Sequence, residues 1–215
     1  MTTPVSFDNR FFSAIWSAIA RREPPEIKEL RAENLRGLTG RVLEVGAGIG
    51  SNFPLYPDTV TSVTALEPES RLRPQAQEAA AAAAIPITVT AGVFEDLAVT
   101  GEDRFDAVVC SLVLCSVTDP DRAAAQAFEV LKPGGEVRYL EHVAHGGALG
   151  LTQRAVDAMF WPRLFGNCHT HRDTVAAIER AGFEIEGHRD DWLKMMGIPM
   201  PSSSIVIGRA VKPAR

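Results

Sequence analysis

The chain has 215 residues, of which 46% are hydrophobic and 23% charged, and its formal net charge is −5 at pH 7. This balance is typical of a globular protein, and the length fits a single domain spanning residues 1–215. Basic and acidic residues are interspersed without a basic stripe, so we expect no nucleic-acid partner. No hydrophobic run approaches the roughly 20 residues of a membrane span, and the first residues lack the pattern of a signal peptide. We therefore expect a cytoplasmic monomer or homodimer that acts on a small molecule.

Two helices are predicted before the first strand. Residues 7–22 place hydrophobic residues, among them Trp16, along one helical face, and Asp8 is available as a cap. Residues 26–38 restart a helix after two prolines. We expect these helices, within residues 1–40, to form an N-terminal cap.

Strand-like and helical segments then alternate through residues 41–142. The strand candidates are VLEV, VTSVTAL, ITVTA, FDAVVC and EVRYLEHV, and the helical segments between them are one near Pro54, an alanine-rich stretch to Ala84, and Pro120 to Leu131. Residues 143–215 continue with helices at 149–160 and 172–181 and with two strands, 183–189 and 203–211. The alternation predicts a doubly wound α/β fold with a mostly parallel seven-stranded sheet. We expect the last two strands to form a hairpin, with the final strand antiparallel.

A glycine-rich turn follows the first strand of this core. In EVGAGIGSN, Gly46, Gly48 and Gly50 let the backbone approach a ligand closely, and Ala47 and Asn52 belong to the same turn. The G-x-G-x-G spacing differs from the G-x-G-x-x-G of dinucleotide sites, because a serine stands where the last glycine is needed. The spacing therefore favours S-adenosylmethionine over NAD as the cofactor.

Acidic residues follow the second and third strands. Glu67, followed by Pro68, ends the second strand, where a carboxylate can accept hydrogen bonds from both ribose hydroxyls. Glu95 and Asp96 follow the third strand, where they can meet the adenine amino group with Phe94 or Leu97 against the ring. Each feature alone is common in proteins, but their joint order along the chain supports one nucleotide-like site.

The motifs EVGAGIG, ALEP, FEDL, FDAVVCSLVLCSV and LKPGG occur in this order and resemble class I S-adenosylmethionine-dependent methyltransferases of the UbiE/methyltransferase-domain-11 kind. The resemblance covers about Arg41 to His142. Three segments, VVCSLVLCSV, YLEHV and WPRLFGNCHTHRDT, resemble a narrower group that includes the animal thiol S-methyltransferase-like proteins.

The resemblance implies a Rossmann-like fold and a role for individual residues in holding the cofactor. The glycine turn would wrap the methionine portion, Glu67 would hold the ribose, and Glu95 and its neighbours would line the adenine. Glu44 would order the glycine turn. The residues implied at the sulfonium end are Cys110, Ser111 and Leu112.

The acceptor is expected to be small and rather apolar, and the resemblance makes a thiol the leading candidate. Glu141 and His142 follow the fifth strand, where either could take a proton from the thiol, or both could only orient the loop. O- or C-methylation of a quinone-like or other lipid-soluble metabolite remains an alternative. A catalytically silent binding module and an NAD-linked oxidoreductase remain alternatives from other classes.

Further candidates for contact with the acceptor lie after the fourth strand and in the last third of the chain: Cys115, His145, Trp161, Cys168, His169 and His171. Three of them fall in NCHTHRD and could be soft metal ligands. No second ligand pair with matching spacing occurs in the sequence, so we expect no metal and interpret NCHTHRD as a structural loop or pocket rim. Cys110 and Cys115 could also suggest a redox or arsenic-binding site, but small buried hydrophobic residues explain the pair more simply.

Overall fold

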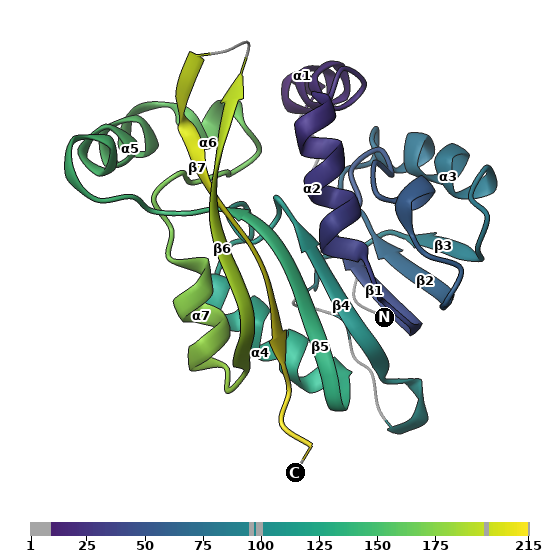
Figure 1. Ribbon diagram of the computed structural model, residues 1–215. Coiled ribbons are helices and arrows are strands. Elements are labelled where there is room, and N and C mark those ends of the chain that lie inside the picture. The colour runs from purple at the N-terminus through teal and green to yellow at the C-terminus, as the bar shows by residue number, and fades with distance from the viewer. Residues whose placement is uncertain (1–9, 95–96, 98–100, 196–197, 215) are drawn as a thin grey trace.

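The computed structural model in Figure 1 describes residues 10–94, 97, 101–195 and 198–214. Its seven strands form one sheet in the order β3-β2-β1-β4-β5-β7-β6. The strands are β1 (Gly40–Val45), β2 (Val60–Leu66), β3 (Ile87–Thr90), β4 (Phe105–Ser111), β5 (Leu131–His142), β6 (Glu184–Met195) and β7 (Ile198–Val211). The pairs among β1 to β5 are parallel, whereas β7 is antiparallel to both β5 and β6. The predicted seven-stranded sheet, its antiparallel last strand and the final hairpin pairing are confirmed.

Helices cover both faces of the sheet (Figure 1). The helices are α1 (Arg10–Ala20), α2 (Pro25–Leu35), α3 (Arg73–Ala81), α4 (Pro120–Val130), α5 (Gly147–Met159), α6 (Trp161–Leu164) and α7 (Thr174–Arg180), with single 3-10 turns η1 (Phe53–Leu55) and η3 (Gly101–Asp103). Alternate residues of β1 enter different cores, because side chains of a strand point to opposite faces in turn. Val42 joins a cluster with Leu35 of α2 and η1, whereas Leu43 joins one with α4 and Ile178 of α7. The sheet is therefore doubly wound, as its sequence pattern predicts.

Several predicted helix boundaries are wrong by a few residues. The second helix runs from Pro25 to Leu35 and not from 26 to 38, because proline suits the first helical position and Gly37, at φ +77°, ends it. The described part of the first helix is shorter than 7–22, and its proposed cap Asp8 lies outside the described residues.

Three other segments differ from their predicted extent. The alanine-rich helix α3 ends at Ala81 and not at Ala84, and the segment near Pro54 is only the 3-10 turn η1. The last helix starts at Thr174 and not at 172, because the Asp173 side chain accepts a hydrogen bond from the backbone N–H of Ala176 and caps it.

The two N-terminal helices have different places in the fold. Leu30 of α2 packs with Leu140, Ile205 and Ile207, so α2 lies on the sheet. Of the two helices, α1 lies at the top of Figure 1, at the same end of the molecule as α5, α6 and the far ends of β6 and β7. Both helices contribute to the predicted cap, because Trp16 of α1 and Arg31 of α2 line one cavity beside the turn after β1.

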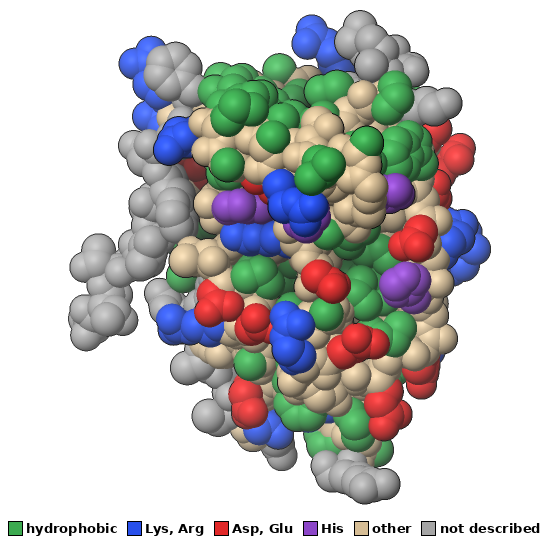
Figure 2. Space-filling view, turned by 90° about the vertical axis from the view of Figure 1, so that its left-hand side faces the viewer, with side chains coloured by type: hydrophobic (Ala, Val, Ile, Leu, Met, Phe, Trp, Pro, Cys, Tyr) green, Lys and Arg blue, Asp and Glu red, His purple; other side chains and the backbone are tan. Residues whose placement is uncertain are grey.

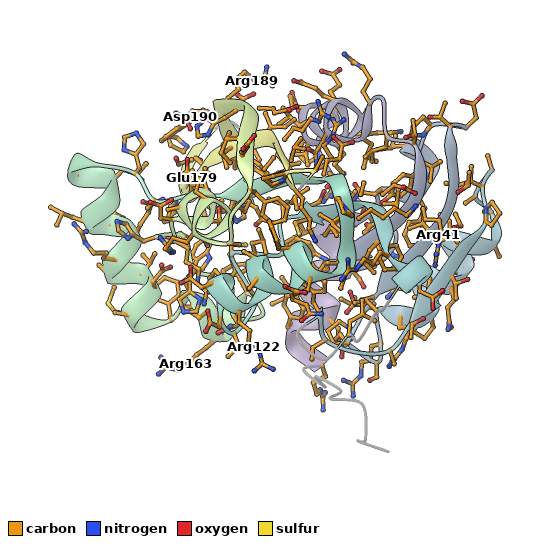
Figure 3. The ribbon with its side chains drawn as sticks, turned by 90° about the horizontal axis from the view of Figure 1, so that it is seen from below. Arg41, Arg122, Arg163, Glu179, Arg189 and Asp190 are labelled. Carbon is orange, nitrogen blue, oxygen red and sulfur yellow. The ribbon has the colours of Figure 1, made fainter. Side chains whose placement is uncertain are left out.

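Hydrophobic side chains are exposed around α5 and α6. Leu151, Met159, Phe160 and Leu164 are 42–64% exposed, and Figure 2 shows hydrophobic side chains gathered at the upper end of this face. Charged residues such as Arg163 and Arg189 lie at the periphery in Figure 3. Within the described ranges, none of the helices has both the length and the apolar character needed to cross a membrane.

Candidate cofactor and acceptor site

The three glycines of the turn after β1 all have left-handed backbone conformations, with φ of +66° at Gly46, +60° at Gly48 and +84° at Gly50. A Cβ at Gly46 would lie 2.5 Å from Val113 Cγ2, and one at Gly50 would lie 2.6 Å from Phe53 Cδ2. Other residues are strained at positive φ, and side chains would not fit here. The turn therefore presents bare backbone at the carboxyl end of β1.

Glu67 joins the end of β2 to this turn. Its side chain is 4% exposed, and its two oxygens accept backbone N–H bonds from Gly48 at 2.6 Å and Glu69 at 2.8 Å. Burial raises the pKa of Glu67 to about 7, although these hydrogen bonds oppose the shift. Pro68, the next residue, is half-buried. Glu67 thus lies where the sequence predicts a ribose-binding carboxylate.

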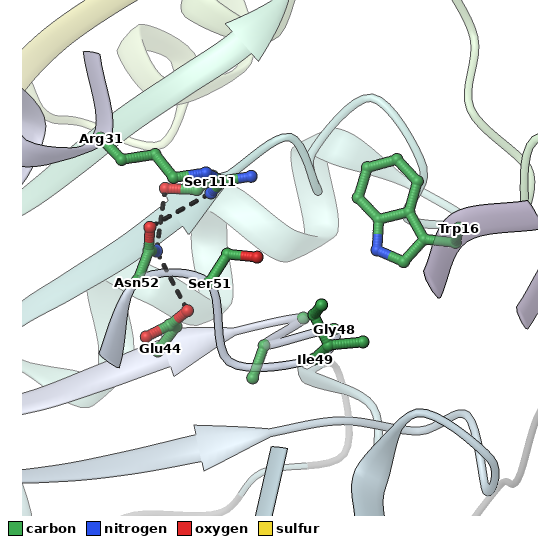
Figure 4. Close-up of a pocket in the computed structure, with 10 residues that line it drawn as sticks. Trp16, Arg31, Glu44, Gly48, Ile49, Ser51, Asn52 and Ser111 are labelled. Atoms are coloured by element: carbon green, nitrogen blue, oxygen red, sulfur yellow. Dashed lines mark hydrogen bonds between the residues drawn. The ribbon is translucent and has the colours of Figure 1, made fainter. Parts of the chain in front are cut away.

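Glu44 organises the other side of the turn through a buried network. Its oxygens accept hydrogen bonds from Asn52 Nδ2 at 3.0 Å (Figure 4) and from the Tyr56 hydroxyl at 2.7 Å. Arg31 of α2 donates to Asn52 Oδ1 at 3.1 Å. Burial raises the pKa of Glu44 to about 7, while Tyr56, Arg31 and Asn52 oppose the shift. Arg31 was missed from the sequence, because its contact with the turn joins elements distant along the chain.

Trp16 of α1 covers the glycine turn. A Cβ at Gly48 would lie 3.1 Å from Trp16 Nε1, and Figure 4 shows the indole across the cavity from Ser111 and Asn52. The cavity measures about 20 Å³ and is also lined by Glu44 and Arg31. This position agrees with the N-terminal cap that the sequence predicts.

The remaining residues predicted to contact the cofactor divide between the cavity and the core. Ser111, at the end of β4, lines the cavity, and Leu112 follows it with φ +58°. Cys110 and Phe94 are 1% and 2% exposed and belong to the core that contains α4, so their side chains are packing residues. Ala47 also lines the cavity. Glu95 and Asp96 lie outside the described residues.

Glu141 holds the loop that follows β4. Its side chain is fully buried, and its oxygens accept backbone N–H bonds from Val113 at 3.0 Å, Leu114 at 2.9 Å and Cys115 at 3.2 Å. Burial raises the pKa of Glu141, and these three hydrogen bonds oppose the shift. This geometry matches the alternative in which Glu141 orients the loop.

Three sulfur and nitrogen atoms meet beside this loop. Cys115 Sγ lies 3.7 Å from Cys168 Sγ and 3.7 Å from His142 Nδ1, and Cys168 Sγ lies 3.6 Å from the same nitrogen. The hydrogen bond between the thiols raises the pKa of Cys115 and lowers that of Cys168. Burial alone would lower the pKa of His142, but Cys115 and Glu141 beside it raise the pKa overall. The sequence proposed all three residues separately, and the fold brings them together.

The other acceptor candidates are less central. Trp161 is 6% exposed and packs with Cys115 and Cys168. His145 is exposed and stands edge-on to Trp192, with 6.0 Å between the ring centroids. The rings of His169 and His171 point to local partners, Asn167 O at 2.7 Å and Arg154 at 3.4 Å. These three histidines therefore do not join the cluster formed by Cys115, His142 and Cys168.

Comparison with known proteins agrees with this geometry. A family model described as a methyltransferase domain matches residues 43–139. Thiol S-methyltransferase TMT1B of Mus musculus is 33% identical over 188 residues, covering 84% of this chain and 75% of the relative. TMT1B of Homo sapiens is 30% identical over an alignment of 217 residues, which covers 94% of this chain and 85% of the relative.

A solved structure extends the likeness to the whole fold. N-methyltransferase NodS from Bradyrhizobium japonicum, in complex with S-adenosyl-l-homocysteine, has a TM-score of 0.68 at 15% identity, covering 95% of this chain and 100% of that one. The predicted family and its cofactor, S-adenosylmethionine, are confirmed by these matches together. The chain belongs to the class I S-adenosylmethionine-dependent methyltransferases, among relatives of the thiol S-methyltransferases.

Proposed function

We propose that this methyltransferase transfers a methyl group to the sulfur of a small, apolar thiol. The observation that carries the proposal is the position of the cluster formed by Cys115, His142 and Cys168. Cys115 follows Ser111 by four residues, which span at most about 14 Å even when fully extended. Apolar side chains of Val156, Phe165 and Met200 pack against the two cysteines and Trp161. The names of the mouse and human relatives support the same acceptor.

The glycine turn and Glu67 fit S-adenosylmethionine, which supplies a methyl group on a sulfonium. The turn offers bare backbone to the methionine portion, as the three glycine positions require. Each Glu67 oxygen accepts one backbone N–H bond, which leaves it a further lone pair for a ribose hydroxyl. Glu44 and Asn52 hold the turn in shape, and Ser111 faces the sulfonium end.

For transfer, the acceptor sulfur must lie in line with the methyl group and about 3 to 3.5 Å from it, in a site that excludes water. The thiolate is the reactive form, so the site must favour loss of the thiol proton. We assign Glu141 a positioning role, because both its oxygens already bind the backbone of the loop that carries Cys115. His142 is the side chain that faces both thiols.

A radiolabelled-methyl assay on a panel of alkyl thiols, phenols and quinols tests this proposal. We expect labelled thioethers from the thiols, and we expect Glu67→Ala to lose activity through weaker cofactor binding. Methylation of phenols or quinols with no transfer to thiols would establish the alternative acceptor class. Binding of adenosylhomocysteine with no transfer to any member of the panel would instead indicate a silent binding module.

A further inference from the structure

The three atoms of the Cys115, His142 and Cys168 cluster are all ligands that soft metal ions prefer. Their separations are 3.6, 3.7 and 3.7 Å. Both cysteines are buried and His142 is half-buried. With zinc–sulfur bonds of about 2.3 Å and zinc–nitrogen bonds of about 2.0–2.1 Å, the ligand atoms of a tetrahedral zinc site lie about 3.5–3.8 Å apart. The observed triangle has these dimensions.

We propose that Cys115, His142 and Cys168 form a zinc site with three protein ligands and an open fourth position. Thiolate and imidazole ligands select zinc over magnesium or calcium, which bind oxygen. No fourth histidine, cysteine or carboxylate joins the group among the residues that the structure describes. Three protein ligands with an open position are the usual arrangement of a catalytic zinc, whereas a structural zinc has four.

The backbone holds the two cysteines in place without a metal. The loop carrying Cys168 binds the loop carrying Cys115 through His169 N–H to Cys115 O at 2.8 Å and Asn167 Nδ2 to Ser116 O at 2.8 Å. Arg172 donates to Val117 O at 2.6 Å. These bonds add to those of Glu141, so the ligand triangle is preorganised, as a functional metal site requires.

The loop carrying Cys115 also contains strained backbone, and an indole donor lies beside the thiols of the cluster. Leu112 has a φ of +58°, which a bulky side chain rarely adopts, and Asn167 has a φ of +65°, which asparagine tolerates better than most residues. The indole N–H of Trp161 is buried against the cysteines and acts as a hydrogen-bond donor toward Cys168. A thiolate at Cys168, or a ligand in the open position, would accept this bond.

The open position suits the acceptor thiol, an assignment that rests on the proposed function. On binding zinc, the thiol releases its proton to solvent and stays as a thiolate at neutral pH. The thiolate's electron pair then forms the new sulfur–carbon bond. The methyl–sulfonium bond breaks, and its electrons remain on the sulfur of adenosylhomocysteine. The product is a neutral thioether, which is a weaker zinc ligand than the thiolate and leaves the site.

Zinc binding to the reduced, chelator-stripped protein tests the site directly. We expect about one zinc per chain after dialysis against zinc chloride, measured by mass spectrometry of the metal. Cys115→Ala, His142→Ala and Cys168→Ala should each lower zinc affinity at least about tenfold, since loss of even an outer-shell partner costs 10–100-fold. Cys110→Ala, which removes a buried cysteine outside the cluster, should keep the full zinc content.

A second measurement needs no variant and covers the case in which a variant fails to fold. Cobalt replacing zinc in the wild-type chain should give the intense near-ultraviolet absorption of thiolate-to-cobalt charge transfer. A reduced, folded wild-type chain that binds adenosylhomocysteine but holds neither zinc nor cobalt overturns the proposal. Cys115 and Cys168 found as a disulfide that forms again after reduction would also overturn it.

Activity separates the zinc proposal from the proposed function. We expect the stripped enzyme to lose at least about tenfold in thiol methylation, to regain it with zinc, and to bind adenosylhomocysteine equally in both states. Equal thiol methylation with and without zinc would reject the open-position assignment while leaving thiol methylation intact. Zinc binding with no thiol methylation would confirm the metal site and reject the proposed acceptor.

Discussion

The buried carboxylates of the cofactor site lower the stability of the cofactor-free protein near neutral pH. The pKa values of Glu44 and Glu67 are raised by burial to about 7 from a usual value of 4.5. Between about pH 4.5 and pH 7, these two carboxyl groups keep their protons in the folded protein but have lost them in the unfolded chain. The free energy of unfolding therefore falls as the pH rises through this range. The sequence predicted Glu67 because it ends a strand beside the glycine turn, whereas Glu44 was implied by the resemblance to class I methyltransferases.

We predict that Glu67→Gln makes the stability of the cofactor-free protein less dependent on pH. The 4.5-to-7 shift corresponds to about 3 kcal/mol, at about 1.4 kcal/mol per pKa unit. Urea denaturation between about pH 5 and pH 8 would measure the slope. Glu129→Gln, on an exposed face of α4, is the matched control and should leave the slope unchanged. A wild-type slope retained in Glu67→Gln would contradict the assigned pKa shift.

The glycine turn provides a second prediction at single residues. Gly50 and Gly37 both have positive φ, but a Cβ at Gly50 would lie 2.6 Å from Phe53 and 2.8 Å from Ala79, whereas nothing lies within 4 Å at Gly37. Alanine at either position should lower the free energy of unfolding by about 1–2 kcal/mol, because a residue with a Cβ is strained in the left-handed conformation. We expect Gly50→Ala to lose about 1–3 kcal/mol more through overpacking. Equal losses of unfolding free energy in the two variants would show that the turn relaxes around the added methyl.

At the scale of elements, the sequence was sufficient for the number and order of the strands, but it placed the last two strands at 183–189 and 203–211 where β6 and β7 run from Glu184 to Met195 and from Ile198 to Val211. It was also weaker for helix ends and for contacts between distant segments. Strands β1, β2 and β4 could be predicted from their hydrophobic runs. Such runs occur because parallel strands in the centre of a sheet are buried on both faces, as these strands largely are. The packing of Trp16 on Gly48 and the meeting of Cys115 with Cys168, 53 residues apart, have no local pattern. From the sequence, NCHTHRD has no matching ligand pair elsewhere. The fold supplies two possible ligands, because it brings Cys115 and His142 next to Cys168.

The position of α1 predicts that this helix moves when the cofactor binds. The cavity under Trp16, about 20 Å³, holds about one water, whereas ligand pockets measure about 300–1,000 Å³. We expect adenosylhomocysteine to change the tryptophan emission of the wild-type chain. Trp16→Phe should bind the ligand by calorimetry without that change, and Trp192→Phe should keep it. An unchanged emission from wild-type protein saturated with ligand would show that α1 stays in place.

At the scale of the whole molecule, the strand order of the sheet brings the glycine turn after β1 next to Ser111 at the end of β4. β1 and β4 are neighbours in the sheet although β2, α3 and β3 lie between them in sequence, so the glycine turn and Ser111 meet at one edge. β5 pairs with β4 on one side and with β7 on the other, so residues 143–215 share the sheet of the cofactor-binding core. This arrangement supports the prediction of a single domain for residues 1–215, which unfolding can test.

We predict that the chain unfolds in one cooperative transition and that adenosylhomocysteine raises its midpoint. A ligand at 100 times its dissociation constant stabilises the folded state by about 2.7 kcal/mol. For a domain of this size, each kcal/mol raises the midpoint by about 2–4 °C, so we expect a shift of about 5–10 °C in calorimetry. NADH at the same concentration should produce no shift, because the serine after Gly50 breaks the dinucleotide spacing. Two separate transitions would reject the single domain, and a shift with NADH alone would reject the role assigned to the glycine turn.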